Sequence, residues 1–349
     1  MIPLFLDILA GFVILGSVLP LVRTGAWWVR IFDFPRGQLA VLGLAVALGY
    51  YLLIDPLETG DQIVLAALGV SVAFLIYRIL PYTRIAPYQT LTCTNPDPGT
   101  RIRLLCSNVL QSNREAEKLL ALIHAKQPDL VLVVETDTWW REALGELDAT
   151  YPHRILHPLD NTYGMLCFSR LPIEDEEVRF LVEDDVPSIF ATVVLPAGAR
   201  IRLVGMHPRP PRPDILQDST YRDAELLIVA RYAEHQELPV IVLGDFNDVA
   251  WSHTTRLFQR IGGLLDPRRG RGLFSTFHAD YPFFRYPLDH VFHSPHFQLE
   301  HLERLGHVGS DHFPIFTVLN LTHDPAGDAP DASEEDVVEA KRLIREAFI

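Results

Sequence analysis

Polar side chains recur where apolar, strand-like runs of the chain begin or end after residue 100. They are Asn108, Glu135, His207, Asp245, Asn247, Asp289, Asp311 and His312. A lone Asn or Asp at the end of a strand normally turns the chain or caps a helix. Eight such positions instead favour a single site, because strand ends that share one sheet edge bring their side chains into one cleft.

The residue types in this set suit a divalent cation and proton transfer. Carboxylates and an amide oxygen are hard oxygen ligands, so the set predicts Mg²⁺ or Mn²⁺. Such a cation polarises a phosphoryl oxygen, while a histidine paired with a carboxylate moves protons. Asp289 and His312 are the candidate pair, because a carboxylate fixes the tautomer of an imidazole. Glu135 directly follows the apolar run VLVV, so it needs a partner when it is buried.

The runs around these residues alternate between helical and strand-like patterns. Apolar residues three and four positions apart predict helices over 114–127, 219–236 and 252–262. The strand-like runs 188–196 and 199–207 meet in the turn PAGA, which predicts a hairpin. Strands that are partly adjacent and partly separated by helices predict an α/β (α+β) domain with helices outside a mixed sheet or two packed sheets.

The first quarter of the chain has a different composition. Three apolar runs, Leu4 to Val22, Leu39 to Ile54 and Gln62 to Leu80, each approach the roughly 20 residues that cross a bilayer. The first run is either a cleaved signal peptide or a retained anchor. It begins without a basic residue and two further runs follow, which favours the anchor. The middle run is short enough for a buried soluble helix, but Trp27 and Trp28 before it suit a membrane interface.

The charges between these runs predict their orientation. Arg23, Arg30 and Arg36 lie between the first two runs, whereas the loop 55–61 has no Lys or Arg. Basic loops stay cytoplasmic, so three crossings place the catalytic part in the cytoplasm, as part of a multi-pass inner or plasma membrane protein. If the first run does not insert, two crossings leave the catalytic part on the side of the N-terminus.

The domain boundaries follow from these patterns. We predict a membrane anchor over 1–86, a linker over 87–100, a catalytic domain over 101–322 and an acidic tail with a terminal helix over 323–349.

Net charge argues against nucleic acid as the favoured partner. Up to residue 86 five acids balance five arginines, so the net charge of −14 belongs to the remainder. An acidic domain repels nucleic acid unless it concentrates positive charge or uses a divalent cation. The basic loops 207–213 and 266–272 are either solvated turns or phosphate-binding segments. Three cysteines without CxxC spacing argue against a disulfide framework and a structural zinc site.

Seven stretches resemble, in order, motifs of the endonuclease/exonuclease/phosphatase superfamily. They are CSNVL, LVLVVET, YGMLCFSR, GMHPRP, LGDFND, PLDHVF and GSDHFPI, and they cover roughly residues 101–320. The resemblance implies a four-layer αββα sandwich that hydrolyses a phosphoester through in-line attack by water.

The resemblance also implies roles for the candidate residues. Glu135 and Asp311 would bind the metal, with Asn108 beside them. Asp245 would orient or activate the attacking water, and Asn247 would hold the phosphoryl oxygens.

The histidines carry the proton chemistry in this resemblance. His312, supported by Asp289, would be the general base or would stabilise the transition state, and His207 would be the acid for the leaving group. Abasic-site endonucleases have an Asp where this chain has Leu110, which argues against that branch and leaves the metal fewer protein ligands. We interpret the remaining histidines as surface or packing residues, including His278, His290, His293, His296, His301 and His307.

The sequence therefore predicts a membrane-anchored, Mg²⁺-dependent enzyme that hydrolyses a phosphodiester or phosphomonoester. The lipid bilayer is its expected partner, and a lipid or headgroup is its expected substrate. A nuclease acting on DNA or RNA is one alternative. A catalytically inactive membrane scaffold is another, and it is disfavoured because all eight site positions keep competent side chains. The loops 208–218 and 266–286 select the substrate, and the sequence does not determine their conformation.

Overall fold

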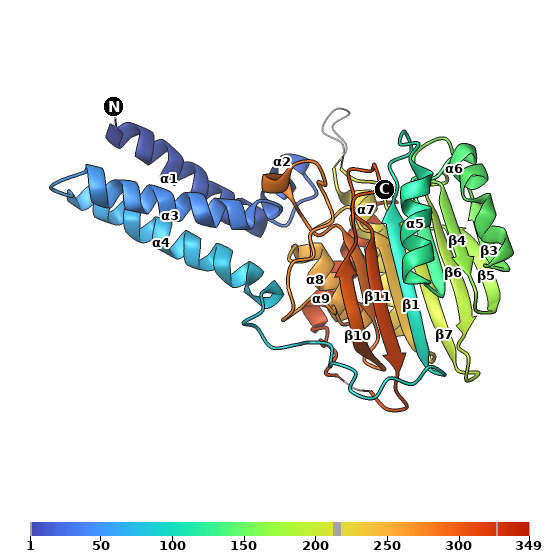
Figure 1. The fold of residues 1–349 in the computed structure, drawn as a ribbon. Helices are drawn as coiled ribbons and strands as arrows, with labels where there is room; N and C mark the ends of the chain where they lie inside the picture. Colours follow the sequence, from blue (N-terminus) through green and yellow to red (C-terminus); the bar gives the residue numbers. More distant parts are fainter. Residues whose placement is uncertain (1, 212–217, 326, 349) are drawn as a thin grey trace.

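Two β-sheets lie face to face in the region after residue 100 (Figure 1) of a computed structural model that describes residues 2–211, 218–325 and 327–348. Sheet A has the strand order β10-β11-β1-β2-β4-β3, and sheet B has the order β5-β6-β7-β8-β9. The strands of sheet A are β1 Arg101–Asn108, β2 Leu130–Val134, β3 His153–His157, β4 Met165–Ser169, β10 Phe297–Arg304 and β11 Ile315–Leu321. Those of sheet B are β5 Ile173–Phe180, β6 Pro187–Val194, β7 Arg200–Met206, β8 Val240–Asp245 and β9 Asp289–His293.

The alternation of side chains along each strand divides the core into layers. In β1, Leu104 and Cys106 point between the sheets, whereas Leu105 points to the outer face of sheet A. Leu203 of β7 and Leu243 of β8 contribute to the same inter-sheet core from the opposite side. Central strands are therefore apolar on both faces, which explains their continuous hydrophobic runs.

Helices cover both outer faces and complete the predicted sandwich. α5 (Ala116–Lys126) and α6 (Thr138–Ala143) pack on sheet A. α7 (Thr220–Glu234), α8 (His253–Gly262) and the terminal helix α9 (Glu334–Glu346) pack on sheet B. The predicted four-layer αββα architecture is thus confirmed.

Three strands, β3, β5 and β10, are absent from the sequence interpretation. All three are edge strands, and β5 carries the acidic sequence IEDEEVRF with no fully buried residue. An edge strand has water on one side, so its composition lacks the apolar signal of an interior strand. The linker covers part of one such edge, because the backbone N–H of Cys93 donates to the carbonyl of Leu299 in β10 (2.8 Å).

Three long helices form a bundle at the N-terminal end of the chain (Figure 1). They are α1 (Ile2–Val18), α3 (Arg36–Leu53) and α4 (Thr59–Ile79), and all three are long and apolar enough to cross a membrane. The bundle buries one stripe of each helix but leaves large side chains outside, with Val41 68% and Val70 72% exposed. Such an apolar outer surface is expected of helices surrounded by lipid.

The bundle docks on the sandwich through the α1–α3 loop and the end of α4. Trp251 donates its indole N–H to the carbonyl of Asp33 (2.7 Å), and the Arg78 guanidinium donates to the carbonyl of Trp251 (2.7 Å). The Tyr82 hydroxyl donates to the carbonyl of Ala250 (2.6 Å). The start of α1 and the α3–α4 turn lie at the opposite end of the bundle (Figure 1), so the sandwich contacts one end only.

Arg30, the last residue of the short helix α2 (Trp27–Arg30), is the central polar contact of this interface. Its guanidinium donates to Asp223 (3.1 Å) and Thr254 (2.6 Å) of the sandwich and to Asp33 (3.4 Å) of its own loop. Arg30 and both carboxylates are buried. The interface therefore joins the two parts through a desolvated ionic network.

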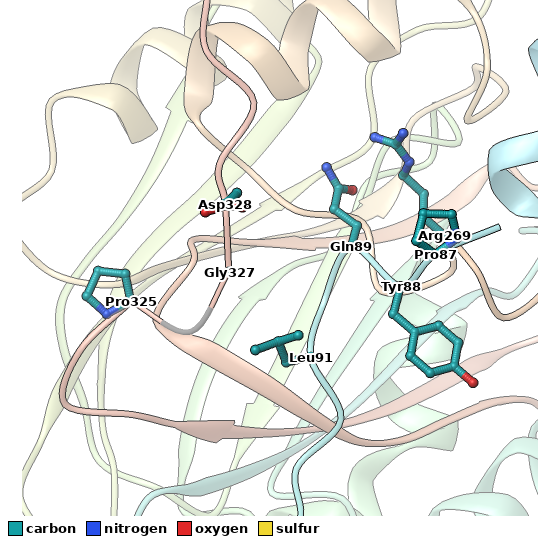
Figure 2. Close-up of a pocket in the computed structure, with 8 residues that line it drawn as sticks. All are labelled: Pro87, Tyr88, Gln89, Leu91, Arg269, Pro325, Gly327 and Asp328. Carbon is teal, nitrogen blue, oxygen red and sulfur yellow. The ribbon is translucent and has the colours of Figure 1, made fainter.

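A pocket with a volume of about 650 Å³ lies between the linker, the loop after α8 and the tail (Figure 2). None of the eight candidate site residues lines it. Its lining residues are Pro87, Tyr88, Gln89, Leu91, Arg269, Pro325, Gly327 and Asp328.

Candidate active site

The parallel strand pairs of both sheets end at the same edge of the sandwich. Asn108 is the last residue of β1, and Glu135 directly follows its parallel neighbour β2. In sheet B, His207 directly follows β7, and Asp245 ends its parallel neighbour β8. Ligand sites in such folds lie at the carboxyl ends of parallel strands, where the loops diverge.

The antiparallel neighbours of these strands supply the remaining residues. Asp289 begins β9 and pairs directly with Asp245 of β8. The pair 311–312 precedes β11, whose Ile315 pairs with Cys106 close to the end of β1. The topology therefore brings the predicted residues to one place.

Asp245 is the centre of this cluster. Its Oδ2 atom accepts a hydrogen bond from Asn108 (3.0 Å) and lies 3.6 Å from Nε2 of His312 and 3.8 Å from Nε2 of His207. Its Oδ1 atom accepts the backbone N–H of Asn247 (2.9 Å). Burial raises the pKa of Asp245, although the two imidazoles oppose the rise.

His312 is fixed by two hydrogen bonds, one to its ring and one from its backbone. Its Nδ1 atom is 2.8 Å from Oδ2 of Asp289, and its backbone N–H donates to the hydroxyl of Ser310 (3.0 Å). The same hydroxyl donates to the carbonyl of Asn108 (2.9 Å). Burial alone would lower the pKa of His312, but Asp289 and Asp245 outweigh it and raise the pKa to about 10. The ring is therefore held with Nδ1 toward Asp289 and Nε2 toward the cluster.

Glu135 and Asn108 form the second half of the site. One Glu135 oxygen accepts from the Asn108 amide (2.8 Å), and the other accepts the backbone N–H of Gln111 (3.3 Å). Burial raises the pKa of Glu135, the hydrogen bond from Asn108 opposes the rise, and the charge of Asp311 adds to it. A divalent cation here would offset both the burial cost and the repulsion, and the oxygen donors match Mg²⁺ or Mn²⁺.

A second group of atoms is also close enough to share a cation. One ligand atom from each of Asp245, Asp289 and His312 lies within 4.8 Å of the others. Two of these residues already satisfy one another through the His312–Asp289 hydrogen bond. The residues of the site thus fit a divalent cation, with Glu135 and Asp311 as the alternative carboxylate pair.

The backbone of the site adopts conformations that L-residues seldom take. Leu110, Glu135 and Asn247 have φ values of 56°, 61° and 51°. Gly244, with φ 147°, precedes Asp245 at a point where a Cβ atom would lie 1.8 Å from the carbonyl oxygen of Met206. Strain of this kind persists only where the surrounding structure enforces it, and it is concentrated at functional sites.

His207 and Asn247 lie on the sheet B side of the cluster. The ring of His207 packs against Tyr163, with centroids 5.4 Å apart, and burial lowers its pKa. Its Nδ1 atom has no hydrogen-bond partner among the described residues. The Asn247 amide donates to the carbonyl of Pro208 (3.0 Å), and Arg222 donates to the carbonyl of Asn247 (2.8 Å).

Several residues that shape the site were not predicted. Ser310 and Tyr163 lie inside the motifs GSDHFPI and YGMLCFSR, so their positions gave a usable signal. Thr276, whose hydroxyl accepts the backbone N–H of Asp289 (3.2 Å), and Arg222 come from segments without such a motif. Their proximity arises only from the folded chain.

One arginine in each of the two basic loops is paired with a carboxylate. Arg268 is buried and donates to Asp266 (2.7 Å). Arg209 pairs with Glu183 (2.9 Å) and Asp185 (2.8 Å). Positions 212–213 of the first loop, and 212–217 of the predicted substrate loop 208–218, lie outside the described residues. Arg268 is therefore not part of a solvated turn, and its charge is already satisfied.

Two of the remaining histidines are buried by packing. His290 lies against Arg268 and its Nε2 is 2.8 Å from the carbonyl oxygen of Asp248. His293 contacts the hydroxyl of Thr90 (2.9 Å). Neither belongs to the Asp245 cluster.

Solved structures share this fold at low sequence identity. D. rerio TDP2 complexed with single strand DNA product is 17% identical, with a TM-score of 0.52 over 63% of this chain and 99% of that chain. The human Nocturnin catalytic domain with bound sulfate anion is 17% identical, with a TM-score of 0.52 over 69% and 99%. An endonuclease/exonuclease/phosphatase family protein from Bacteroides thetaiotaomicron is 17% identical, with a TM-score of 0.51 over 66% and 98%. These similarities show the fold alone.

Sequence comparison is more specific at the level of the family. No curated protein sequence matches the chain. The model of the Endonuclease/Exonuclease/phosphatase family matches residues 105–312, a segment that contains all eight candidate residues. The chain therefore belongs to the Endonuclease/Exonuclease/phosphatase family.

Proposed function

We propose that this protein is a membrane-anchored, divalent-metal-dependent phosphoesterase that hydrolyses a lipid phosphoester or a lipid headgroup ester. The family includes metal-dependent phosphoesterases and nucleases. The observation that carries the proposal is the meeting of Asp245, the His312–Asp289 pair and Glu135 at one sheet edge. This edge belongs to a sandwich on which three membrane-length apolar helices are docked.

The site divides into a cation side and a proton side. Glu135, Asn108 and Asp311 would hold Mg²⁺ or Mn²⁺, which when bound polarises a phosphoryl oxygen and offsets its charge. We assign the cation here rather than to the Asp245 group, because His312 and Asp289 already satisfy one another (2.8 Å).

The remaining residues act on water and on the phosphoryl group. Asp245 orients the attacking water, since its Oδ2 atom faces the cluster from the end of β8. His312 presents Nε2 to the phosphoryl oxygens while Asp289 holds Nδ1, and the Asn247 side chain binds the same oxygens. His207 donates a hydrogen bond to the leaving oxygen from the sheet B side, and it does so as a neutral ring because burial lowers its pKa.

The docking geometry supports a cytoplasmic catalytic domain. Arg23 and Arg30 of the α1–α3 loop and Arg36 at the start of α3 lie at the end of the bundle that contacts the sandwich, so the basic end of the bundle and the catalytic domain lie on one side. Basic loops remain cytoplasmic in multi-pass membrane proteins. Three crossings would leave the N-terminus outside.

A nuclease is the second candidate, because the neighbouring fish TDP2 structure holds a single strand DNA product. The charge distribution weighs against it here: the domain is acidic, and Arg209 and Arg268 are already paired with carboxylates. Nucleic-acid binding should fall steeply with salt, whereas hydrolysis of a lipid ester should not.

The proposal is tested with the full chain in lipid nanodiscs. Release of product is measured from a panel of lipid phosphomonoesters, lipid phosphodiesters, DNA and RNA, with Mg²⁺ and with a chelator. We expect metal-dependent hydrolysis of a lipid ester and a loss of about 10²- to 10⁴-fold in His312→Ala. His323→Ala is the matched control, because His323 is 99% exposed and lies in the tail.

Each outcome has a defined meaning. Preferential cleavage of DNA or RNA would replace the lipid proposal with the nuclease. Equal activities of the His312 and His323 variants would show that the hydrolysis comes from elsewhere. No hydrolysis of any ester in lipid would favour the inactive scaffold.

A further inference from the structure

A cavity of about 330 Å³ lies between the bundle and the catalytic domain. Trp27, Ile31 and Phe34 of the α1–α3 loop form one wall. Asn247 and His312 of the candidate active site line the same cavity. The space that holds the reacting group is therefore continuous with a space bounded by the membrane anchor. We call this cavity the interface groove.

The interface groove is apolar away from the active-site end. Phe277 and Leu288 line it on the sandwich side, and both belong to the apolar contacts around Trp251. Arg30 also lines the groove, but its terminal nitrogens are occupied by Asp223, Thr254 and Asp33. A nucleic-acid strand needs several free cationic groups along its path, and this wall does not provide them.

The groove opens where the apolar helices meet the catalytic domain. Trp27 and Ile31 are four residues apart, at the point between the end of α1 and the start of α3. Ile31 is 52% exposed although it lines the groove. Trp27 also lines the groove, and a tryptophan at the end of membrane-length helices suits the level of the lipid interface.

The walls of the groove are fixed by the docking contacts. The carbonyl of Asp33 accepts from Trp251, and Phe34 packs into the apolar cluster that contains Leu288. Because the α1–α3 loop is held in this way, a ligand would not have to order the loop in order to bind.

We propose that the interface groove binds one alkyl or prenyl chain of a lipid phosphoester while the phosphoryl group lies between Asn247 and His312. This inference rests on the proposed function and names the part of the substrate that the membrane anchor selects.

The test uses alkylphosphonates from methyl to octyl, which resist hydrolysis because carbon replaces the ester oxygen. Their binding to the full chain in nanodiscs with Mg²⁺ is measured by calorimetry, with empty nanodiscs subtracted. We expect affinity to rise about fourfold for each methylene until the groove is filled, since a buried methylene contributes about 0.8 kcal/mol.

Ile31→Asn is the diagnostic variant, and Val22→Asn is its matched control. Both residues are exposed aliphatics of the same loop, 52% and 56% exposed, but only Ile31 lines the groove. We expect Ile31→Asn to weaken octylphosphonate binding at least tenfold and to leave methylphosphonate binding unchanged. Val22→Asn should resemble the unmodified protein with both ligands.

Hydrolysis of alkyl p-nitrophenyl phosphates separates this inference from the proposed function. If binding depends on chain length but no hydrolysis occurs, the proposed phosphoesterase function is wrong and the inferred role of the groove is supported. If hydrolysis occurs but binding does not depend on chain length, the proposed phosphoesterase function is supported and the inferred role of the groove is wrong. Absence of octylphosphonate binding, or equal losses in the Ile31 and Val22 variants, would also overturn it.

Discussion

Replacing Arg30 by Met should loosen the N-terminal helical bundle from the sandwich. The substitution keeps the length and apolar stem of the side chain but removes the contacts to Asp223 (3.1 Å), Thr254 (2.6 Å) and Asp33 (3.4 Å). Arg222 bonds to Asp223 as well (2.7 Å), so the same carboxylate connects the interface to a residue that holds the active-site loop.

The expected loss of unfolding free energy depends on which partners the two carboxylates retain in the variant. Removing one partner of a buried ionic network costs about 3 to 5 kcal/mol when a charge is left unpaired. Here Asp223 retains Arg222, and Asp33 retains Arg36 (2.7 Å), so we expect the lower end, about 3 kcal/mol. For a domain of this size that corresponds to a fall in Tm of about 6 to 12 °C.

The assay is thermal unfolding of the full chain in nanodiscs, combined with hydrogen exchange of the segment 248–255. Exchange should accelerate there, because Trp251 and Thr254 lose a fixed partner surface. Arg23→Met is the control, since Arg23 is 58% exposed and pairs only at the rim with Glu339 (3.2 Å).

Equal Tm values for the Arg30 and Arg23 variants would refute the reasoning. Unchanged exchange of 248–255 in the Arg30 variant would refute it too, because the docked interface could not then depend on the buried network.

Further predictions concern the metal and a buried acid. Glu135→Gln should raise the Mg²⁺ concentration for half-maximal activity at least about tenfold. A larger increase of this concentration in Asp289→Asn would show instead that the cation binds at the Asp245 group. Chelator should abolish hydrolysis, and added Mg²⁺ should restore it. Burial raises the pKa of Glu225 from 4.5 to about 8, so the protonated form is favoured in the folded protein. The contribution of Glu225 to the unfolding free energy should therefore be most favourable below pH 4.5 and should fall as pH rises from 4.5 through 8, by up to about 5 kcal/mol. Glu225→Gln should remove the Glu225 part of this pH dependence in denaturant titrations at pH 5 and 9 and leave the part that arises from His312, whose pKa is also raised. An unchanged slope would contradict the assignment.

The interior of the fold was predictable because its strands are apolar on both faces and end in polar residues. Asp245 and His312 could be picked out for this reason, without knowledge of which strands are neighbours. The edge strand β5 could not be predicted from the sequence, because its acidic residues are as typical of a solvated loop as of a strand.

The interface groove could not be predicted either, because Ile31 and His312 are far apart in sequence and meet only when the bundle docks. Arg30 shows the same limit: as a sequence feature it is a charge that orients helices, whereas in the fold it is a buried link between domains.

The docked interface also determines how far the candidate active site can reach. A catalytic domain on a free linker would sweep a hemisphere around its anchor and meet esters in the surrounding solution. Here the linker is pinned to β10, and the loop before α3 is pinned to Asp223. If the three helices span a bilayer, the catalytic centre stays at one height above it, and encounter becomes a two-dimensional search in which the substrate diffuses within the membrane to a stationary opening.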